Sequence, residues 1–584
     1  MSQVLRPALS LAEPLAAIER RRDGSLLLRS PHQLGNTARC ASEWLHKWSQ
    51  LDPSRTFVAE RSGDGWRRVS YAEALDSAQR IGQALVRRNL GVDAPVMVLS
   101  ENSVDHALIA LGASYVGVPL VVVSTAYSLL SQDHEKLRNI AKQVSPGLVY
   151  VSDPTRYQRA LQAIAMPATS IEELLAEPSD GTAERANAEV QPTDIAKILF
   201  TSGSTGAPKG VINTHRMITA NQQQVLQIWK FLAETPPVVV DWLPWSHTFG
   251  GNFNFNMVLA NGGTLYIDGG KPLPGLFDVT LRNLRDVSPT MYFNVPRGLE
   301  MLLPHLESDA ELRQTFFKKC QIVFYAAASL PKHVWAGYEQ LAAQERNGDM
   351  ALVSAWGSTE TAPMATAVHY PGSTSGVIGL PVPGCEVKLV PTAGKLEARL
   401  RGPNITPGYW KQEELTKQAF DEEGFYCIGD GLKFVKDSAP ELGLMFDGRV
   451  TEDFKLVTGT WVHVGALRVR LLEAAKGLIQ DAAITGHDRS WVGALVFLNP
   501  SIAASLSTIE IQTRLREALH VLSSGAQGSS LIVARLLPLT EPASLDAGEI
   551  NDKAYLNQGA VLRHRAADVE RLYADAPEPE VIQA

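Results

Sequence analysis

KILFTSGSTGAPKG, residues 197–210, is the stretch that decides the expected fold and chemistry of this chain. An apolar run typical of a buried strand enters a loop rich in hydroxyl groups and glycine, and the loop ends in a lysine. The glycines let the backbone approach a ligand closely, the hydroxyls can donate hydrogen bonds to phosphate oxygens, and the lysine supplies positive charge. The predicted phosphate-handling residues are Thr201, Ser202, Gly203, Ser204, Thr205, Gly206, Lys209 and Gly210.

Two other interpretations of this loop are a Walker A motif and a flexible linker. A Walker A lysine is followed by Ser or Thr, whereas Gly210 follows Lys209 here and Pro208 precedes it. Flexible Ser/Gly linkers rarely place Pro and Lys in this arrangement directly after a buried strand. We therefore predict a nucleotide loop of a different class.

The length and composition of the chain indicate a large enzyme. A chain of 584 residues is too long for a single hydrophobic core and predicts several packed subdomains. Hydrophobic residues make up 45% and charged residues 20%, which is ordinary for a globular protein. The net charge of −8 gives no reason to expect nucleic acid or an anionic membrane as a partner.

Cysteine usage and the N-terminal region indicate a cytoplasmic protein. The four cysteines lie far apart without CxxC or Cys/His spacing, so neither a disulfide framework nor a zinc site is predicted. The N-terminal region lacks the apolar stretch of a secretory signal. No run of about 18 apolar residues is present to span a membrane.

Strand-like and helix-periodic segments alternate along the chain, which predicts α/β layers. For example, VMVLS (96–100) and LVVVS (120–124) flank the helical pattern VDHALIALGASYVGV. The sharpest change in composition lies at FDGRVTEDF, residues 446–454, where a new α/β pattern of about 130 residues begins. We place the main domain border there.

Two further segments carry side chains suited to a nucleotide. WGSTETAP, residues 356–363, combines an aromatic ring, a glycine, hydroxyls and the acid Glu360. YCIGDGLKF, residues 426–434, places Asp430 between glycines, where its carboxylate can accept both hydroxyls of a ribose. Gly-Asp-Gly is also an ordinary turn sequence, and an acid in a loop is often only solvated.

Two other segments are candidates for a substrate pocket. VDWLPWSHTFGGN, residues 240–252, places His247 after a strand and before a pair of glycines. VFYAAASLP, residues 323–331, is a strand that runs into small residues. A lone histidine is usually a structural residue, and three alanines in a row are equally compatible with tight core packing.

The loop at residues 197–210 resembles the signature of the adenylate-forming superfamily, which includes acyl-CoA synthetases, luciferases and peptide-synthetase adenylation domains. Members activate carboxylates with ATP. The segments WLPWSHTFGG, DGRVTEDFKL with TGTW, and DAGEINDKAYLNQ are together most similar to feruloyl-CoA synthetases, which activate hydroxycinnamic acids. The resemblance extends from SYAEALDSAQRIGQAL to the C-terminus.

For the nucleotide, the resemblance implies a role for each motif residue. Trp356 would stack on the adenine, Thr359 would bind the α-phosphate, and Asp430 and Arg449 would contact the ribose. Gly357 is also predicted to bind the nucleotide. Glu360 and Thr205 would hold Mg²⁺, which together with Lys209 would offset the charge that develops on the phosphates.

For the acid, the resemblance implies a pocket beside the nucleotide. His247 would lie against the substrate carboxylate. Many members have an aromatic residue immediately before this histidine, whereas this chain has Ser246. The predicted pocket wall consists of Phe249, Gly250, Gly251, Asn252, Tyr325, Ala326, Ala327 and Ala328.

The C-terminal segments depart most from the superfamily pattern. The hinge sequence is Gly-Arg-Val-Thr-Glu at residues 448–452, which predicts Thr451 or Glu452 as the hinge residue. Most members carry a catalytic Gly-Lys near the end, but Glu549 follows Gly548 here, and the nearest lysine, Lys553, is predicted to take that role. The alternative for Lys553 is an ordinary surface lysine. The residues predicted to face CoA are Lys455, Gly459 and Trp461.

The implied fold is α/β, with a large multi-subdomain N-terminal adenylate-forming domain (1–448), a hinge (449–452) and a small mobile C-terminal α/β lid (453–584). The implied activity uses ATP, Mg²⁺ and CoA to convert a small carboxylic acid, such as ferulic acid, first into an acyl-adenylate and then into a thioester. Other aromatic or fatty acids, a carrier-protein thiol as acceptor, and a non-catalytic nucleotide-binding protein remain alternatives. A homodimer is the expected assembly.

Overall fold

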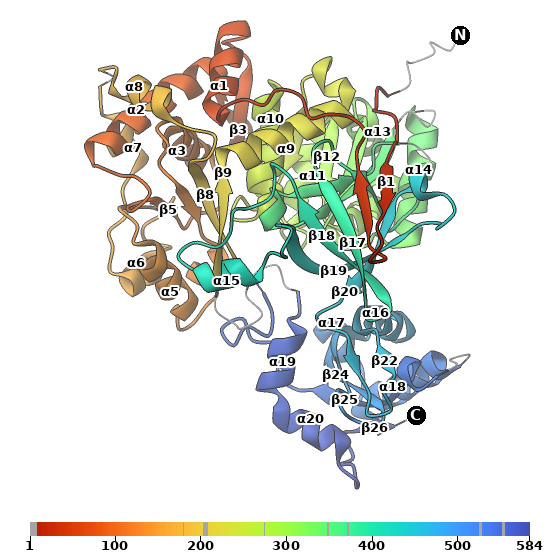
Figure 1. Cartoon of the computed structure of the whole chain (residues 1–584). Helices are drawn as coiled ribbons and strands as arrows, with labels where there is room; N and C mark the ends of the chain where they lie inside the picture. The colour runs from red at the N-terminus through yellow and green to blue at the C-terminus, as the bar shows by residue number, and fades with distance from the viewer. Residues whose placement is uncertain are drawn as a thin grey trace.

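The computed structural model of this chain describes residues 9–178, 180–202, 208–273, 275–346, 350–370, 373–524, 528–551 and 555–583. Strands and helices alternate along most of this length. A smaller α/β unit at the C-terminal end, blue in Figure 1, lies below the rest. The predicted α/β class, with a large N-terminal part and a small C-terminal unit, is confirmed.

The first sheet carries the segment that leads into the predicted phosphate loop. Its strand order is β7-β5-β6-β8-β9, and only β9 is antiparallel to its neighbour. The strands are β5 (Val96–Val98), β6 (Leu120–Val122), β7 (Leu148–Tyr150), β8 (Ile195–Ser202) and β9 (Pro208–Thr214). The parallel strands β5, β6 and β7 are continuous apolar runs, as expected for parallel strands that are covered on both faces.

Helices cover both faces of this sheet. α2 and α3 pack on one face, and α5 and α6 pack on the other. Ser70 caps the start of α2, because its hydroxyl accepts from the backbone N–H of Glu73 and the Glu73 carboxylate accepts from the N–H of Ser70. The helices of this region are α2 (Tyr71–Arg87), α3 (Val104–Tyr115), α4 (Thr125–Leu129), α5 (Glu135–Val144), α6 (Gln158–Ile164), α7 (Ile171–Leu175) and α8 (Thr182–Glu189).

The second sheet has the order β10-β11-β3-β4 and lies in the same N-terminal part. Its strands are β3 (Thr56–Ser62), β4 (Gly65–Ser70), β10 (Val238–Asp241) and β11 (Thr264–Ile267). The helical segments that precede or follow these strands along the chain are α1 (Ala41–Leu51), α9 (His215–Ile228), η1 (Lys230–Ala233), α10 (Phe255–Ala260) and α11 (Phe277–Asp286).

A π-helix, Phe249–Asn254, connects this sheet to α10. Such helices are rare and often occur at functional sites. Its two glycines are required by close packing: a Cβ on Gly250 would lie 2.3 Å from the carbonyl oxygen of Leu243, and one on Gly251 would lie 2.2 Å from that of Trp245. Both distances are far below van der Waals contact, so no larger residue fits without a backbone shift.

The third sheet has 11 strands and extends toward the C-terminal unit. The strand order is β1-β2-β17-β18-β19-β20-β16-β15-β14-β13-β12, with parallel pairing from β12 to β14. The strands are β1 (Ala17–Arg20), β2 (Leu26–Arg29), β12 (Met291–Asn294), β13 (Ile322–Tyr325), β14 (Ala351–Gly357), β15 (Met364–Ala367), β16 (Val377–Pro381), β17 (Glu386–Thr392), β18 (Lys395–Arg401), β19 (Tyr426–Phe434) and β20 (Leu444–Arg449). The helical segments are α12 (Pro296–Ser308), α13 (Ala310–Phe317), α14 (Lys332–Arg346), η3 (Thr359–Thr361), α15 (Glu413–Gln418) and η4 (Pro440–Leu442).

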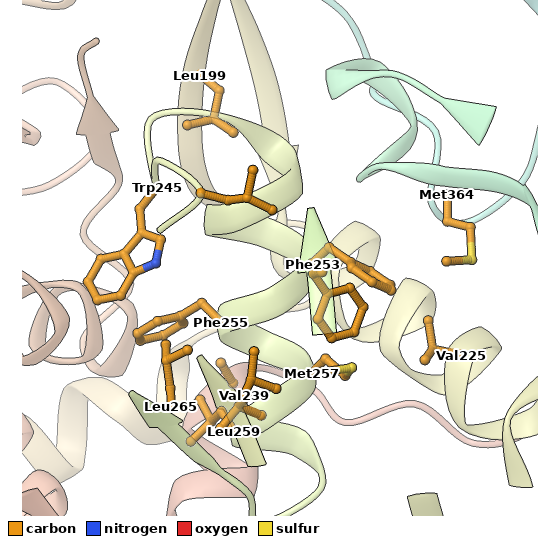
Figure 2. Close-up of a cluster of buried hydrophobic side chains, with 14 of the residues drawn as sticks. Leu199, Val225, Val239, Trp245, Phe253, Phe255, Met257, Leu259, Leu265 and Met364 are labelled. Carbon is orange, nitrogen blue, oxygen red and sulfur yellow. The ribbon is translucent and has the colours of Figure 1, made fainter. Parts of the chain in front are cut away.

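One hydrophobic core joins the three sheets. Figure 2 shows part of it: Leu199 of β8, Trp245 and Phe253 on either side of the start of the π-helix, and Met364 of β15 belong to the same buried cluster. The segments that carry the sequence motifs are therefore fixed to one another by apolar packing. Among the described residues, no helix combines the length and the apolar character needed to cross a bilayer.

The C-terminal unit has its own core and its own sheet, ordered β23-β24-β25-β26. β20 ends at Arg449, the first residue of the predicted hinge, and β21 begins at Phe454, shortly after the hinge. The boundaries of the hinge stay a prediction. The elements are β21 (Phe454–Lys455), β22 (Trp461–Val462), α16 (Val464–Ala474), β23 (Ile479–Thr485), β24 (Val492–Leu498), α17 (Pro500–Ala503), α18 (Thr508–Ser523), η5 (Ser529–Leu531), β25 (Val533–Leu539), α19 (Gln558–His564), α20 (Ala566–Tyr573) and β26 (Ile582–Gln583).

Gly251→Ala is expected to destabilise the protein, because the added methyl group would overlap the carbonyl of Trp245. Overpacking of this kind costs about 1 to 3 kcal/mol, which thermal unfolding of the purified variant would detect. Gly91→Ala is the matched control, since a Cβ there meets no atom within 4 Å. Equal melting temperatures for both variants would contradict this account of the π-helix.

Candidate functional site

The β8–β9 hairpin presents the ends of the predicted phosphate loop. Thr201 of β8 is the register partner of Lys209 of β9. The hydroxyl oxygen of Thr201 is buried and has no hydrogen-bond partner among the described residues, so it is available to a ligand. The intervening positions Gly203, Ser204, Thr205 and Gly206 lie outside the described residues, and their roles stay predictions.

A tyrosine hydroxyl links the lysine of this hairpin to Glu360. The ammonium of Lys209 lies 3.4 Å from the hydroxyl of Tyr409 and 4.7 Å from the centre of its ring. The same hydroxyl donates to Oε1 of Glu360 at 3.2 Å and lies 3.3 Å from the hydroxyl of Tyr426. Burial, with the nearby Glu360 carboxylate, raises the pKa of Tyr409 well above its ordinary value, so the phenol keeps its proton at neutral pH.

Glu360 lies in a tight 3-10 turn, Thr359–Thr361, directly after β14. The side chain of Ser358 caps this turn by accepting from the N–H of Glu360 at 3.2 Å. Glu360 is 6% exposed, and Thr359 beside it is also buried. Gly357 is required before the turn, because a Cβ there would lie 1.8 Å from the carbonyl oxygen of Pro363.

Trp356 of β14 and Asp430 of β19 meet on interior strands of the third sheet. The indole N–H of Trp356 donates to Oδ2 of Asp430 at 3.0 Å. Arg449, the register partner of Asp430 on the neighbouring strand, places its Nε 3.5 Å from Oδ1. Burial raises the pKa of Asp430, while Arg449 and Trp356 act in the opposite direction.

The remaining oxygen of Asp430 is suited to a ligand. Oδ1 is buried and has no hydrogen-bond partner among the described residues, although the charged Arg449 lies nearby. Buried carboxylate oxygens normally accept hydrogen bonds, so a ligand that brings hydroxyl groups would satisfy it. This is the chemistry of a ribose site.

The segment with His247 forms a turn ahead of the π-helix. His247 is half-buried, and its backbone carbonyl accepts from the N–H of Gly251 at 2.8 Å. Asp241 closes the base of this segment, because its carboxylate accepts from the N–H of Leu243 at 3.0 Å and from the amide of Asn254 at 2.9 Å. One buried carboxylate therefore holds both ends of the turn and π-helix.

The predicted pocket residues in the π-helix differ in their surroundings. Phe249 is half-buried and packs edge-on against Phe324 with 5.4 Å between ring centres. Asn252 is fully buried, and its amide donates to Oδ1 of Asn213 at 2.8 Å and to Oγ1 of Thr248 at 3.1 Å. Gly250 and Gly251 are also buried, at the close contacts described above.

The other predicted pocket segment follows β13. The ring of Tyr325 is buried, and its hydroxyl accepts from the N–H of Gly376 at 3.1 Å. Ala326 is half-buried, whereas Ala327 and Ala328 are exposed. Ala327 has a φ of +79°, the left-handed conformation that favours glycine.

The predicted CoA-facing residues lie together on one hairpin of the C-terminal unit. Lys455 of β21 is the register partner of Trp461 of β22, and its ammonium lies 5.0 Å from the centre of that ring. Gly459 forms the turn between them with a φ of +81°. Of the predicted hinge residues, Thr451 is exposed and Glu452 is half-buried.

Two buried ionic contacts involve residues of the C-terminal unit that the sequence did not single out as partners. Lys395 of β18 and Asp453, immediately after the predicted hinge, form an ion pair of 2.5 Å in which both side chains are buried. Glu549, the residue that replaces the usual lysine, is buried and pairs with Arg565 at 2.7 Å. Despite its burial, hydrogen bonds from Arg565 and Ser544 keep the pKa of Glu549 below its ordinary value.

The loop ahead of Lys553 docks on the N-terminal part. The carboxylate of Asp546 accepts from the hydroxyl of Ser131 at 2.6 Å and from the N–H of Gln132 at 3.1 Å. The ammonium of Lys136 donates to the carbonyl of Leu545. Lys553 itself lies outside the described residues, so its predicted role stays a prediction.

Sequence reasoning missed Tyr409, Asp241 and Asp546. Tyr409 follows Gly408 in PGYW, and an aromatic residue after a Pro-Gly turn is the one local signal that was present. It reaches the site because the N–H of Trp410 donates to the carbonyl of Gly210 at 2.7 Å, which adds this segment to the edge of β9. Asp241 and Asp546 stand within the segments VDWLPWSHTFGGN and DAGEINDKAYLNQ, but nothing in those segments marks either acid as a structural contact.

Comparison with known proteins agrees with this geometry. The model of the family described as AMP-binding enzyme matches residues 45–410, which is more than half of the chain. That range contains Lys209, Glu360 and Tyr409, whereas Asp430 and Arg449 lie beyond it.

Curated relatives and a solved structure are similar along much of the chain. A carboxylic acid reductase of Mycobacterium marinum is 24% identical over 559 residues, covering 87% of this chain and 46% of the relative. The human long-chain-fatty-acid–CoA ligase 6 is 26% identical over 471 residues, covering 68% of this chain and 64% of the relative. The O-succinylbenzoate coenzyme A synthetase of Bacillus subtilis in complex with AMP has the same fold, with a TM-score of 0.67, 18% identity, and coverage of 90% of this chain and 98% of that one. This chain thus spans less than two thirds of the length of these two curated relatives.

Asp241→Asn is expected to change how stability depends on pH. Burial raises the pKa of Asp241 from 3.8 to about 7. The native state therefore keeps a proton that the unfolded chain releases, and the wild type should lose stability relative to the variant as pH rises through about 4 to 7. Melting temperatures of both proteins across that range would measure the divergence.

The exposed Asp64, replaced by Asn, serves as control and should follow the wild type at every pH. A difference in melting temperature between the Asp241 variant and the wild type that stays constant across this pH range would contradict the raised pKa of Asp241. Asn254 can rotate to accept from the new amide, since its Oδ1 has no other partner among the described residues, so the substitution should be tolerated.

Proposed function

Because this chain belongs to the AMP-binding enzyme family, we propose that it activates a carboxylic acid with ATP and then transfers the acyl group to the thiol of coenzyme A. The observation that carries the proposal is the convergence of segments distant in sequence. The hydroxyl of Tyr409 links Lys209 to Glu360. Glu360 follows Trp356 by four residues in the sequence, and the indole of Trp356 donates to Asp430, which lies beside Arg449.

These groups fit the parts of ATP. Lys209 and the hydroxyls of the loop would bind phosphate oxygens, including that of Thr201, which has no hydrogen-bond partner among the described residues, and Thr359 would reach the α-phosphate. Asp430 and Arg449 would bind the ribose, and Trp356 would contact the adenine.

The donor set also fits Mg²⁺. The ion prefers carboxylate and phosphate oxygens and is usually bound through one or two protein side chains together with substrate phosphates. The residues that would hold it are Glu360 and Thr205. When bound, it supplies positive charge that offsets the charge on the phosphates. Among the described residues, no cluster of three or more metal-binding side chains competes for it.

In the first half-reaction, a carboxylate oxygen of the acid attacks the α-phosphorus, and the bond from that phosphorus to the β-phosphate oxygen breaks. Pyrophosphate leaves, and Lys209 would offset its charge. His247 would lie against the carboxylate, and Lys553 would offset the repulsion between carboxylate and phosphate as they approach.

In the second half-reaction, the sulfur of CoA attacks the carbonyl carbon, and the carbon–oxygen bond to AMP breaks. The thiol proton is released and AMP leaves. Rotation at Thr451 or Glu452 would withdraw Lys553 and bring the Lys455–Trp461 hairpin, with Gly459 at its turn, to the CoA channel. The docking of Asp546 on Ser131 and Gln132 supports an orientation suited to the first half-reaction.

For the substrate we propose a hydroxycinnamic acid such as ferulic acid. The support is the similarity of WLPWSHTFGG and DAGEINDKAYLNQ to feruloyl-CoA synthetases, together with the aromatic side chains around Phe249. An aromatic ring bound beside Phe249 could make edge-on contacts of the same kind. A fatty acid is the second candidate, favoured by the similarity to the human fatty-acid ligase. A carrier-protein thiol as acceptor in place of CoA remains the alternative.

Release of AMP by the purified protein should require an acid and CoA together. We expect fast turnover with ferulic, p-coumaric and caffeic acids and slow turnover with benzoic and medium-chain fatty acids, each measured with and without CoA. Preference for a fatty acid would be consistent with the proposed two-step mechanism but would reject a hydroxycinnamic acid as the substrate. AMP release that CoA does not stimulate would reject CoA as the acceptor. Absence of AMP release with every acid, despite ATP binding, would favour a non-catalytic nucleotide-binding protein.

Lys553→Ala should abolish the first half-reaction and spare the second. Loss of the ammonium leaves the repulsion between carboxylate and phosphate uncompensated, whereas thioester formation from a supplied acyl-adenylate does not need it. Pyrophosphate exchange measures the first step, and thioester formation from synthetic acyl-adenylate measures the second. Arg516→Ala, exposed on α18, is the control. If both steps survive in Lys553→Ala, the lysine has been assigned wrongly.

A further inference from the structure

Both strands of the β8–β9 hairpin, which carries the candidate phosphate loop, form hydrogen bonds with the π-helix Phe249–Asn254. The ammonium of Lys197 on β8 donates to the carbonyl of Gly251 at 2.6 Å. On β9, Oδ1 of Asn213 accepts from the amide of Asn252 at 2.8 Å. Lys197 and Asn213 are register partners, so two facing residues of the hairpin hold two consecutive residues of the π-helix.

The surroundings of Lys197 are unusual for a cation. Its ammonium lies 5.8 Å from the centre of the Phe255 ring, and the residue borders a small cavity between α1, α3, α9 and α10. Most of that cavity is apolar, with Ala41, Ala110, Leu111, Leu120, Ile218 and Leu259 in its lining. Burial lowers the pKa of Lys197 to about 8, and no ion pair with a carboxylate accompanies it among the residues described.

An apolar side chain would fill this space without the cost of desolvating a charge. Packing therefore does not account for a lysine at this position. The contact that does account for it is the hydrogen bond to Gly251, because charged donors make the stronger hydrogen bonds. The amide of Asn256 reaches the same carbonyl at a longer 3.3 Å, which leaves Lys197 as its main partner.

We propose that Lys197 is a positioning residue for acid recognition: with Asn213 it locks the π-helix, and hence the wall from His247 to Asn252, to the hairpin that carries the phosphate loop. The inference rests on the proposed function and deepens it. The acid must present its carboxylate to a phosphorus held by the hairpin, so the wall and the loop must keep a fixed separation. A displacement of about 1 Å at such a site can cost about a hundredfold in rate.

The contact leaves the nucleotide-binding residues untouched. Lys209, Glu360 and Asp430 do not contact Lys197, and the β8–β9 ladder persists without its side chain because the pairing is made by the backbone. Loss of Lys197 should therefore weaken use of the acid and spare the nucleotide.

The test compares Lys197→Met with the wild type in acid-dependent pyrophosphate exchange. We expect the KM for the acid to rise about tenfold, as for loss of one charge-assisted hydrogen bond, while the KM for ATP stays within about twofold. Lys388→Met is the matched control, because Lys388 is a buried lysine that pairs with Asp421 and Glu423 away from the π-helix. It should leave both KM values unchanged. An unchanged acid KM in Lys197→Met, or an equal rise for acid and ATP, would overturn the proposal.

Hydrogen–deuterium exchange provides a readout that does not depend on activity. In Lys197→Met, backbone amides of residues 249–256 should exchange faster than in the wild type, while those of residues 208–214 should not. If no acid supports pyrophosphate exchange in the wild type, the proposed function fails. The hydrogen–deuterium exchange result then decides the positioning role alone, and unchanged protection of the amides of residues 249–256 overturns it. Asn213→Ser is the second variant should Lys197→Met not fold, with the same outcomes expected.

Discussion

The antiparallel pairing of β8 with β9 is the constraint on which the candidate site depends. It brings Thr201 and Lys209 face to face at the ends of the phosphate loop. The outer edge of β9 then binds the backbone at Tyr409 and Trp410, so that the Tyr409 hydroxyl reaches both Lys209 and Glu360. The other end of the hairpin holds the π-helix. The β8–β9 hairpin thus connects the candidate nucleotide loop, the turn that carries Glu360 and the candidate acyl wall.

Buried carboxylates around this unit are held at an energetic cost. Burial raises the pKa of both Asp241 and Asp430, and only part of that cost is offset by their hydrogen bonds. Asp241 uses its bonds internally, to close the segment that carries His247. Asp430 keeps an oxygen without a hydrogen-bond partner among the described residues. Perturbed carboxyl groups with unused hydrogen-bonding capacity are typical of binding sites, where a ligand supplies what the protein leaves out.

Much of the fold and the site could be predicted because the signals were local. Strand and helix alternation, the glycines of the loop, and the acids Glu360 and Asp430 all lie within short motifs. The contacts that organise the site could not be predicted, because they join positions distant in sequence. Tyr409 lies 200 residues from Lys209, and Lys197 lies 54 residues from Gly251. The role of Glu549 was equally hidden, since its partner Arg565 stands in a different element.

The most direct test of the account is the affinity of the protein for AMP, measured by calorimetry on Asp430→Asn and on Asp447→Asn. Both substitutions remove one charge from the β19–β20 pair of strands, but only Asp430 meets Trp356 and Arg449, whereas Asp447 pairs with Lys433 at the surface. The account predicts that Asp430→Asn weakens AMP binding by at least about tenfold and that Asp447→Asn binds like the wild type. Wild-type affinity in Asp430→Asn would contradict the assignment of a nucleotide site to Trp356, Asp430 and Arg449.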